Sequence, residues 1–179
     1  MALEDVRKQI NQVDDELLEL LDKRLVCSRQ VAANKIVTQD YIFKPEREKQ
    51  IYDRIIADGK IVSMSVMKSI IRNSRQFQYE IYVDEGKEHK EFINSLDEHT
   101  KQIFETGGIL KLKLKADKTC EKALNINDII MTVADTGLDI LRIGIENDIV
   151  DIEINVTEDE ASRKKAYVIS YMLFMETMH

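Results

Sequence analysis

The chain has 179 residues, of which 44% are hydrophobic and 33% are charged, so it can bury a core and keep a polar surface. Its formal net charge of −7 does not favour a nucleic-acid-binding protein, because phosphate binding requires a basic surface. No apolar run is long enough to span a membrane, and Cys27 and Cys120 lack metal or redox spacing, so we expect a cytoplasmic protein with reduced, packed cysteines.

The N-terminal part has the periodicity of helices. Apolar residues recur at helical spacing from Val6 to Val31 without an intervening Gly or Pro, which predicts one long helix that ends near Thr38. Pro45 suits the first position of a second helix, because its missing N–H has no partner there, and this helix should run to about Asp58.

A third helix should begin after Ser63 or Ser65, since either hydroxyl can cap it, and should continue through Tyr82. The following residues, 84–106, are highly charged with a thin apolar stripe. They predict a helical connector that is closed by the two glycines at 107–108.

The pattern then changes to that of strands. The segment ILKLKLK at 109–115 alternates strictly, as a half-exposed strand does, and a helix is expected over about 121–135. Two apolar segments, 138–146 and 149–156, flank the dipeptide Asn147-Asp148, which predicts a β-hairpin with a short turn.

Thr157 and Glu160 have the spacing of a capping box for a last helix that reaches Met175. The order β-α-β-β-α is most of a split βαβ (ferredoxin-like) unit without its final strand. We therefore predict an α+β protein with an all-α three-helix module over residues 1–83, a charged helical connector over 84–108 and a small α+β domain over 109–179.

Five polar residues lie on helix faces that are otherwise apolar. Arg24 lies within about 40° of the apolar residues of the first helix, and Lys35 lies about 20° from Arg24, at about 100° per residue. Glu48 interrupts the apolar face of the second helix in the same way, and Ser74 and Gln78 interrupt that of the third. Because charged residues are rarely buried without partners, these faces are expected to converge on a polar cavity.

A structural explanation stays open for each of these residues alone. Long Lys and Arg side chains can lie along apolar surface with their charge in water, and a buried Arg24–Glu48 pair could be purely structural. Five such residues on three helices instead favour a shared site. Its excess of cations predicts an anionic ligand, since Arg binds carboxylates through two parallel hydrogen bonds.

Arg7 lies on the same predicted helix as Arg24, about 25 Å away along the axis at 1.5 Å per residue. It also points about 100° away from Arg24, so one small molecule could not easily contact both side chains on one helix. If Arg7 serves a site, we expect that site to belong to a partner subunit packed in antiparallel fashion. The alternative is a solvated surface arginine.

Three segments together resemble the all-helical (type II) chorismate mutases over about residues 3–80. They are VRKQINQVDDELLELLDKR near the N-terminus, PERE at 45–48 and SIIRNSRQFQ at 69–78. The resemblance implies an isomerase that rearranges chorismate, a dicarboxylate, to prephenate in phenylalanine and tyrosine biosynthesis. It also implies an intertwined homodimer that uses no metal and no cofactor.

The resemblance assigns catalytic roles to three residues. Arg24 matches an arginine that binds a substrate carboxylate, and Lys35 and Gln78 match the pair that hydrogen-bonds the ether oxygen of the substrate. The chemistry agrees with this set, because a concerted rearrangement needs orientation of the substrate and stabilisation of the negative charge that grows on that oxygen.

The same resemblance assigns the substrate-binding residues. Arg7 matches the arginine that crosses to the partner's site, Glu48 matches the acid that holds the ring hydroxyl, and Ser74 matches a polar wall residue. Arg47 matches a supporting arginine. Lys44 departs from the family, which usually carries an Asp before the proline. We expect it either to bind a substrate carboxylate in place of the hydroxyl contacts of that Asp or to be a loop substitution with its side chain in water.

Two rival functions stay open. An isochorismate-pyruvate lyase uses the same helical fold and much of the same pocket, and a weakly catalytic regulatory or binding subunit would retain the ligand site. The C-terminal domain is similar only in element order to small amino-acid-sensing (ACT-like) domains, and a dimerisation module is an equal alternative.

Overall fold

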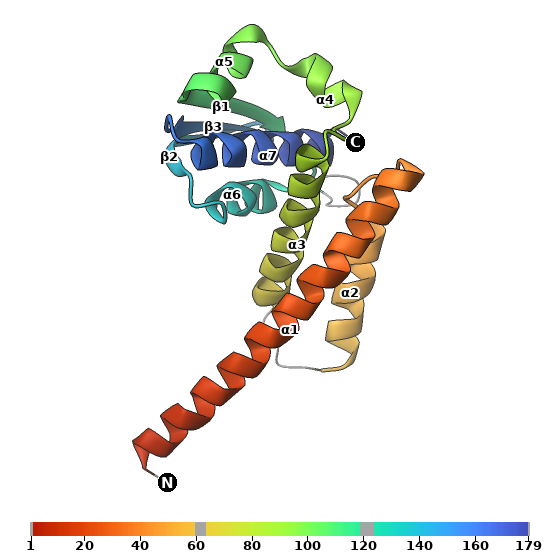
Figure 1. Cartoon of the computed structure of the whole chain (residues 1–179), viewed down its shortest axis with the longest axis vertical. Coiled ribbons are helices and arrows are strands. Elements are labelled where there is room, and N and C mark those ends of the chain that lie inside the picture. The colour runs from red at the N-terminus through yellow and green to blue at the C-terminus, as the bar shows by residue number, and fades with distance from the viewer. Residues whose placement is uncertain (1, 60–63, 119–123, 179) are drawn as a thin grey trace.

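The computed structural model describes residues 2–59, 64–118 and 124–178, which form a helical part and an α+β part (Figure 1). The long helix α1 projects away from the rest of the molecule, α2 and α3 lie beside its C-terminal half, and the α+β part lies near the C-terminal end of α3. The three helices of the first part are α1 (Leu3–Thr38), α2 (Pro45–Ala57) and α3 (Met64–Asp84).

The ends of these helices follow from local sequence. Gln39 ends α1 in the left-handed conformation, with φ of 53°, and its N–H reaches back to the last helical carbonyls. Pro45 occupies the first turn of α2, so the predicted boundaries of both helices are confirmed. Ser65 lies inside the first turn of α3 and is not its cap, whereas the alternative cap, Ser63, lies outside the described residues.

Most of α1 is exposed, and only two of its residues are buried. The predicted apolar stripe includes Ile10, Val13 and Leu17, which keep 53%, 61% and 49% of their surface exposed. A single chain therefore leaves much of this apolar face exposed, because α1 has 36 residues and α3, which packs on it, has 21. Cys27, which was expected to pack inside, is also exposed, and Cys120 lies outside the described residues. No helix in the described part of the chain has the length and apolar character needed to cross a membrane.

The segment predicted as a helical connector contains two short helices, α4 (Lys90–Ser95) and α5 (Glu98–Thr106). They bury Phe92 and Ile103, the apolar stripe of an otherwise charged segment. Gly107 follows α5 with φ of 83°, and a Cβ at this position would lie 2.8 Å from the carbonyl oxygen of Val156. A glycine is required here because the chain turns against the sheet.

The C-terminal part contains a three-stranded antiparallel sheet in the order β1-β3-β2, as the predicted split βαβ connection requires. Helix α6 connects the two outer strands, and β3 lies between them. Asn147 and Asp148 form the predicted hairpin turn with φ of 47° and 68°. The elements are β1 (Gly108–Lys115), α6 (Ile126–Ala134), β2 (Asp139–Glu146), β3 (Ile149–Val156) and α7 (Glu160–Thr177).

Two helix starts differ from the prediction. Helix α6 begins at Ile126, five residues after the predicted start, because Asn125 caps it by accepting the N–H of Asp128. The first predicted residues of this helix, 121–123, lie outside the described residues. The predicted capping box of α7 is wrong, since Asp159 caps this helix by accepting the N–H of Ser162 at 2.8 Å.

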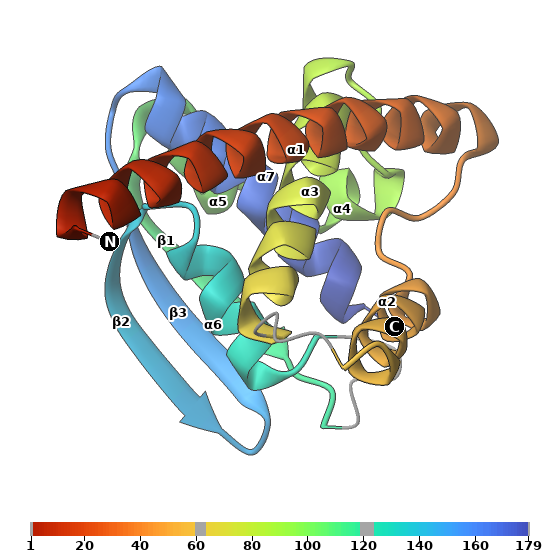
Figure 2. The same cartoon turned by 90° about the horizontal axis from the view of Figure 1, so that it is seen from below.

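Helix α7 forms the centre of the core. One side of it packs against the sheet and another against α3 (Figure 2). Tyr171, Met172 and Leu173 are completely buried, because the C-terminal half of this helix is enclosed by protein on all sides. Tyr79 of α3 meets Tyr171 edge to face at a centroid distance of 5.1 Å. One apolar core therefore runs from the helical part into the sheet, and the division at residues 83 and 108 stays a prediction.

Candidate active site

Polar side chains from α1 and α3 meet around one backbone carbonyl. Arg24 of α1 donates from Nη1 to the carbonyl oxygen of Ile70 at 3.2 Å, and the hydroxyl of Ser74 donates to the same oxygen at 2.9 Å. One turn from the end of α1, Lys35 donates from Nζ to the carbonyl oxygen of Ile42 at 2.7 Å. These polar groups therefore lie where α1 packs against its neighbours, because they belong to the apolar faces of the helices.

The two cations of α1 are partly removed from water. Burial lowers the pKa of Arg24, and the nearby Cys27 and Glu48 oppose this effect. Burial is also the main cause that lowers the pKa of Lys35, and Asp40 and Glu48 are among the charges that oppose it. Both cations therefore interact with the carboxylate of Glu48, and weak hydration strengthens their attraction for an anionic ligand.

Glu48 of α2 reaches α3 across the helix interface. Its Oε1 forms an ion pair with Arg75, and its side chain is 16% exposed. The hydroxyl of Tyr52, one turn further along α2, donates to Oε2 at 3.3 Å. Burial, followed by the charge of Glu48, raises the pKa of Tyr52, so this hydroxyl acts as a hydrogen-bond donor. Because a carboxylate offers about four acceptor positions, Glu48 retains capacity for a ligand hydroxyl.

Gln78 of α3 is buried and only partly satisfied. Its Nε2 donates to the carbonyl oxygen of Ser74 at 3.1 Å, and its Oε1 is buried without a hydrogen-bond partner among the described residues. The amide nitrogen carries a second N–H, which is available to an acceptor. An unsatisfied buried amide is uncommon in native proteins and is typical of positions that contact a ligand.

A cavity of about 560 Å³ adjoins this region between α1, α3 and the ends of α6 and α7. Arg24 and Ser74 belong to its polar lining, which also includes the acids Glu80 and Asp135, and Ile70 and Phe77 are among its apolar lining residues. Lys35 and Gln78 are not among its lining residues, so this cavity meets only one end of the predicted site. In the described part of the chain, no group of three or more His, Cys, Asp or Glu side chains is placed to hold a metal ion.

Of the three other predicted residues, Arg7 and Arg47 lie away from this cluster, whereas the charge of Lys44 acts on Lys35. Arg47 is exposed on α2, where its Nη1 donates to Gln50 at 3.3 Å. Lys44 precedes α2 without a side-chain cap and instead forms an ion pair with Asp40. Arg7 lies near the projecting end of α1, and its closest acid is Glu4 at 3.6 Å. Within one chain, the structure does not bring Arg7 to the other residues.

Two charged residues at the site escaped the sequence analysis. Arg75 is buried on α3, and its Nε donates to Oε1 of Glu176 at 2.9 Å. Glu176 lies near the end of α7 and is completely buried. The available signal was an acid among apolar residues on a buried helix, since Met172 and Leu173 lie one turn before it.

Three packed helices thus bring partly buried cations and a carboxylate of α2 close together. Residues 6–79 match the family of type II chorismate mutases, and this segment is a chorismate mutase type II domain. The rest of the chain lies outside this match. No solved structure matches the chain significantly.

Three characterised proteins are similar to the chain. The T-protein of Haemophilus influenzae is 29% identical over 181 residues, which cover 98% of this chain and 45% of that protein. The bifunctional chorismate mutase/prephenate dehydratase of Aquifex aeolicus is 33% identical over 60 residues, or 34% of this chain and 17% of that protein. The chorismate mutase of Methanocaldococcus jannaschii is 42% identical over 53 residues, or 30% of this chain and 54% of that protein. The chain thus spans about half or less of each relative.

Proposed function

We propose that this chain catalyses the rearrangement of chorismate to prephenate as an isomerase of aromatic amino-acid biosynthesis. The observation that supports the proposal is that the charges of Arg24 and Lys35 both act on Glu48, inside the segment that matches the type II chorismate mutases. Gln78 is buried on the neighbouring helix, with its Oε1 unpaired among the described residues. Two relatives whose names include chorismate mutase support it.

The contacts of each group support its role in this reaction. Arg24 binds a substrate carboxylate, while Lys35 and the free N–H of Gln78 hydrogen-bond the ether oxygen as the C–O bond breaks. Glu48 accepts the ring hydroxyl with the acceptor positions that Arg75 and Tyr52 leave open. The rearrangement is intramolecular and concerted, so the protein needs only to hold the reactive conformation and stabilise this charge.

We further propose that the chain works as a homodimer in which α1 of one subunit covers α1 of the other. The exposed apolar side chains of α1 support this arrangement, because monomeric proteins rarely expose apolar stripes of this length. Antiparallel packing would carry the projecting end of α1, with Arg7, toward the partner's site, as a twofold-symmetric interface requires.

Mixing two inactive variants tests the crossed site. Arg7→Ala and Lys35→Ala are each expected to reduce activity by about 100-fold or more, because each removes a cation from every site. In a mixed dimer, one site keeps both its own Lys35 and the partner's Arg7. Random reassociation after mild unfolding should therefore restore about a quarter of the wild-type activity, since half of the dimers carry one intact site of two.

The control for this experiment mixes Arg7→Ala with a chain that carries both substitutions. No dimer in that mixture contains Arg7, so activity should stay low although subunits exchange. If the first mixture also stays inactive while native mass spectrometry detects mixed dimers, the crossed arrangement is wrong.

Assays of chorismate and isochorismate side by side separate the enzymatic alternatives. Prephenate formation from chorismate supports the mutase, whereas pyruvate release from isochorismate at a higher rate would favour the lyase. Slow turnover together with tight binding of substrate or of a partner enzyme would favour a regulatory subunit.

For the C-terminal part, we propose a ferredoxin-like unit that either senses a ligand or supports dimerisation. The strand order β1-β3-β2 supports the fold, and no feature of the described residues selects between the two roles. Titration of the activity with phenylalanine, tyrosine and tryptophan distinguishes them, since only a sensing domain would change the rate.

A further inference from the structure

The C-terminal helix contributes a charged residue to the region of the proposed site. Glu176 of α7 lies outside residues 6–79, yet its Oε1 accepts the Nε–H of Arg75 at 2.9 Å. Arg75 in turn forms an ion pair through Nη1 with Glu48. A continuous chain of charged contacts therefore runs from the C-terminal part of the molecule to the acid assigned to the substrate hydroxyl.

The guanidinium of Arg75 is held in place by contacts with several residues. Its guanidinium lies 5.0 Å from the ring centroid of Phe43, while its Nε and Nη1 contact carboxylates on two different helices. Because the guanidinium is planar and its donors are rigidly spaced, the position of Nε fixes the direction of Nη1. Removal of Glu176 would remove the contact that fixes Nε, so the direction in which Nη1 meets Glu48 would be less well determined.

We propose that Glu176 is a positioning residue, which holds Arg75 by a hydrogen bond and thereby orients Glu48 toward the substrate. The inference rests on the proposed function, since the role of Glu48 belongs to it. The α+β part is then a structural component of the site. A shift of α7 would move Glu176 and Arg75 and would change the orientation of Glu48 toward the substrate.

The charges around Glu176 make this link sensitive to pH. The groups that face it are Lys35 of α1, Glu48 of α2, and Arg75 and Tyr79 of α3. Burial raises the pKa of Glu176 to about 7, although Arg75 opposes this shift. Above that pH, two carboxylates share one buried arginine, and the additional negative charge disfavours a dianionic substrate.

Two substitutions at one position separate hydrogen bonding from charge. Glu176→Gln keeps an oxygen for the Nε–H of Arg75, so kcat/KM at pH 6 should stay within about 3-fold of wild type. Glu176→Ala removes the acceptor, and kcat/KM should fall about 10- to 100-fold because small displacements in a site have effects of this size. The wild-type KM should rise above pH 7, and this rise should be absent from Glu176→Gln.

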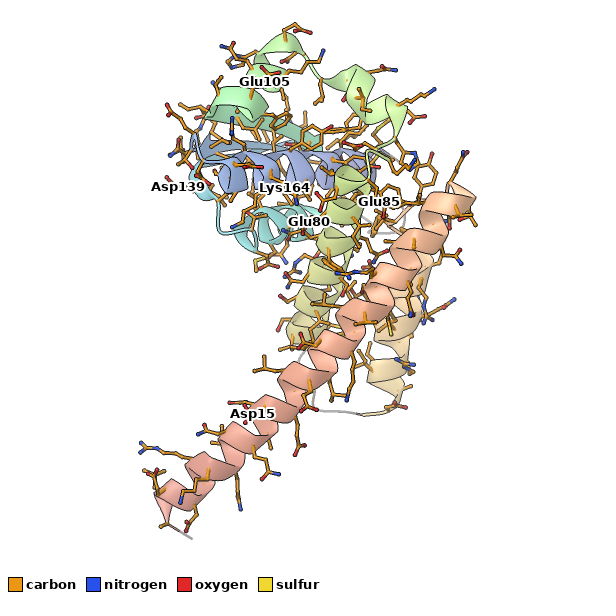
Figure 3. The ribbon with its side chains drawn as sticks, viewed as in Figure 1. Asp15, Glu80, Glu85, Glu105, Asp139 and Lys164 are labelled. Atoms are coloured by element: carbon orange, nitrogen blue, oxygen red, sulfur yellow. The ribbon has the colours of Figure 1, made fainter. Side chains whose placement is uncertain are left out.

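Lys164→Gln is the matched control on the same helix. Lys164 of α7 also pairs with α3, through Glu80 at 3.2 Å and Asp84 at 2.8 Å (Figure 3). It lies about three turns before Glu176 along α7. Its loss removes an α7–α3 ion pair without affecting Arg75, so kcat/KM and the pH profile should match wild type.

The outcomes are distinguishable. If folded Glu176→Ala keeps wild-type kcat/KM, or if Glu176→Gln retains the rise in KM above pH 7, the positioning role is overturned. Should Glu176→Ala not fold, Glu176→Gln and its pH profile decide alone. If the wild-type chain does not convert chorismate, the proposed function fails. If the wild-type chain converts chorismate and Lys35→Ala does not, the proposed function holds, and the Glu176 variants test the positioning role alone.

Discussion

Replacing Lys35 by alanine is expected to lower the turnover of chorismate by about 100- to 1000-fold, the usual effect of removing one preorganised donor from a developing negative charge. Lys35 is a partly buried donor whose ammonium group already points inward, to the carbonyl oxygen of Ile42 at 2.7 Å. Its loss should lower kcat more than it raises KM, because the charge on the ether oxygen grows mainly in the transition state. Steady-state kinetics of prephenate formation measure this.

The matched control is Lys23→Ala on the same helix. Lys23 is exposed and lies 3.9 Å from Glu19, one turn away, so its removal should change neither kcat nor KM. Circular dichroism and thermal melting should show that both variants keep the fold. Retained turnover in folded Lys35→Ala would remove Lys35 from the catalytic set.

Arg75→Met is expected to have the largest effect on stability, a loss of about 3–5 kcal/mol at pH 8, the range for an ion pair broken inside a protein. The substitution leaves Glu176, which is completely buried, and Glu48, which is mostly buried, without their cation. Urea unfolding at pH 8 measures the difference in free energy of unfolding between this variant and wild type.

The loss should become smaller as the pH falls below about 7. The folded-state pKa of Glu176 is raised to about 7 from a usual value of 4.5, so ionisation of this group destabilises the fold as the pH rises through that interval. Protonation at lower pH removes one of the two charges that Arg75 neutralises. Repeating the urea titration at pH 6 should therefore show a smaller difference than at pH 8.

Arg72→Met is the control for this prediction. Arg72 is also a buried arginine of α3, and its Nε lies 2.9 Å from Asp135, but that carboxylate keeps 20% of its side-chain surface exposed. Water can solvate the partner after the substitution, so we expect a smaller loss, about 1–3 kcal/mol. Equal losses in both variants would contradict the argument from the buried charges.

Much of the local structure is predictable because it depends on neighbours in the chain. The end of α1 near Thr38, the start of α2 at Pro45 and the hairpin turn at Asn147 each depend on the backbone preferences of a few residues. The cap of α7 was assigned wrongly because Thr157 and Asp159 both have capping side chains, and the carboxylate of Asp159 is the one that accepts the helix N–H.

The sequence by itself determined which face of each helix carries the polar residues, since the position of Arg24, Lys35 or Gln78 in an apolar stripe is a property of helical periodicity. Only the tertiary structure decided the partners. Arg75 and Glu176 are 101 positions apart, and their contact depends on α7 packing against α3, which no local pattern records. The packing of α1 shows the same limit, because periodicity identifies its apolar face but not how much of that face one chain can cover.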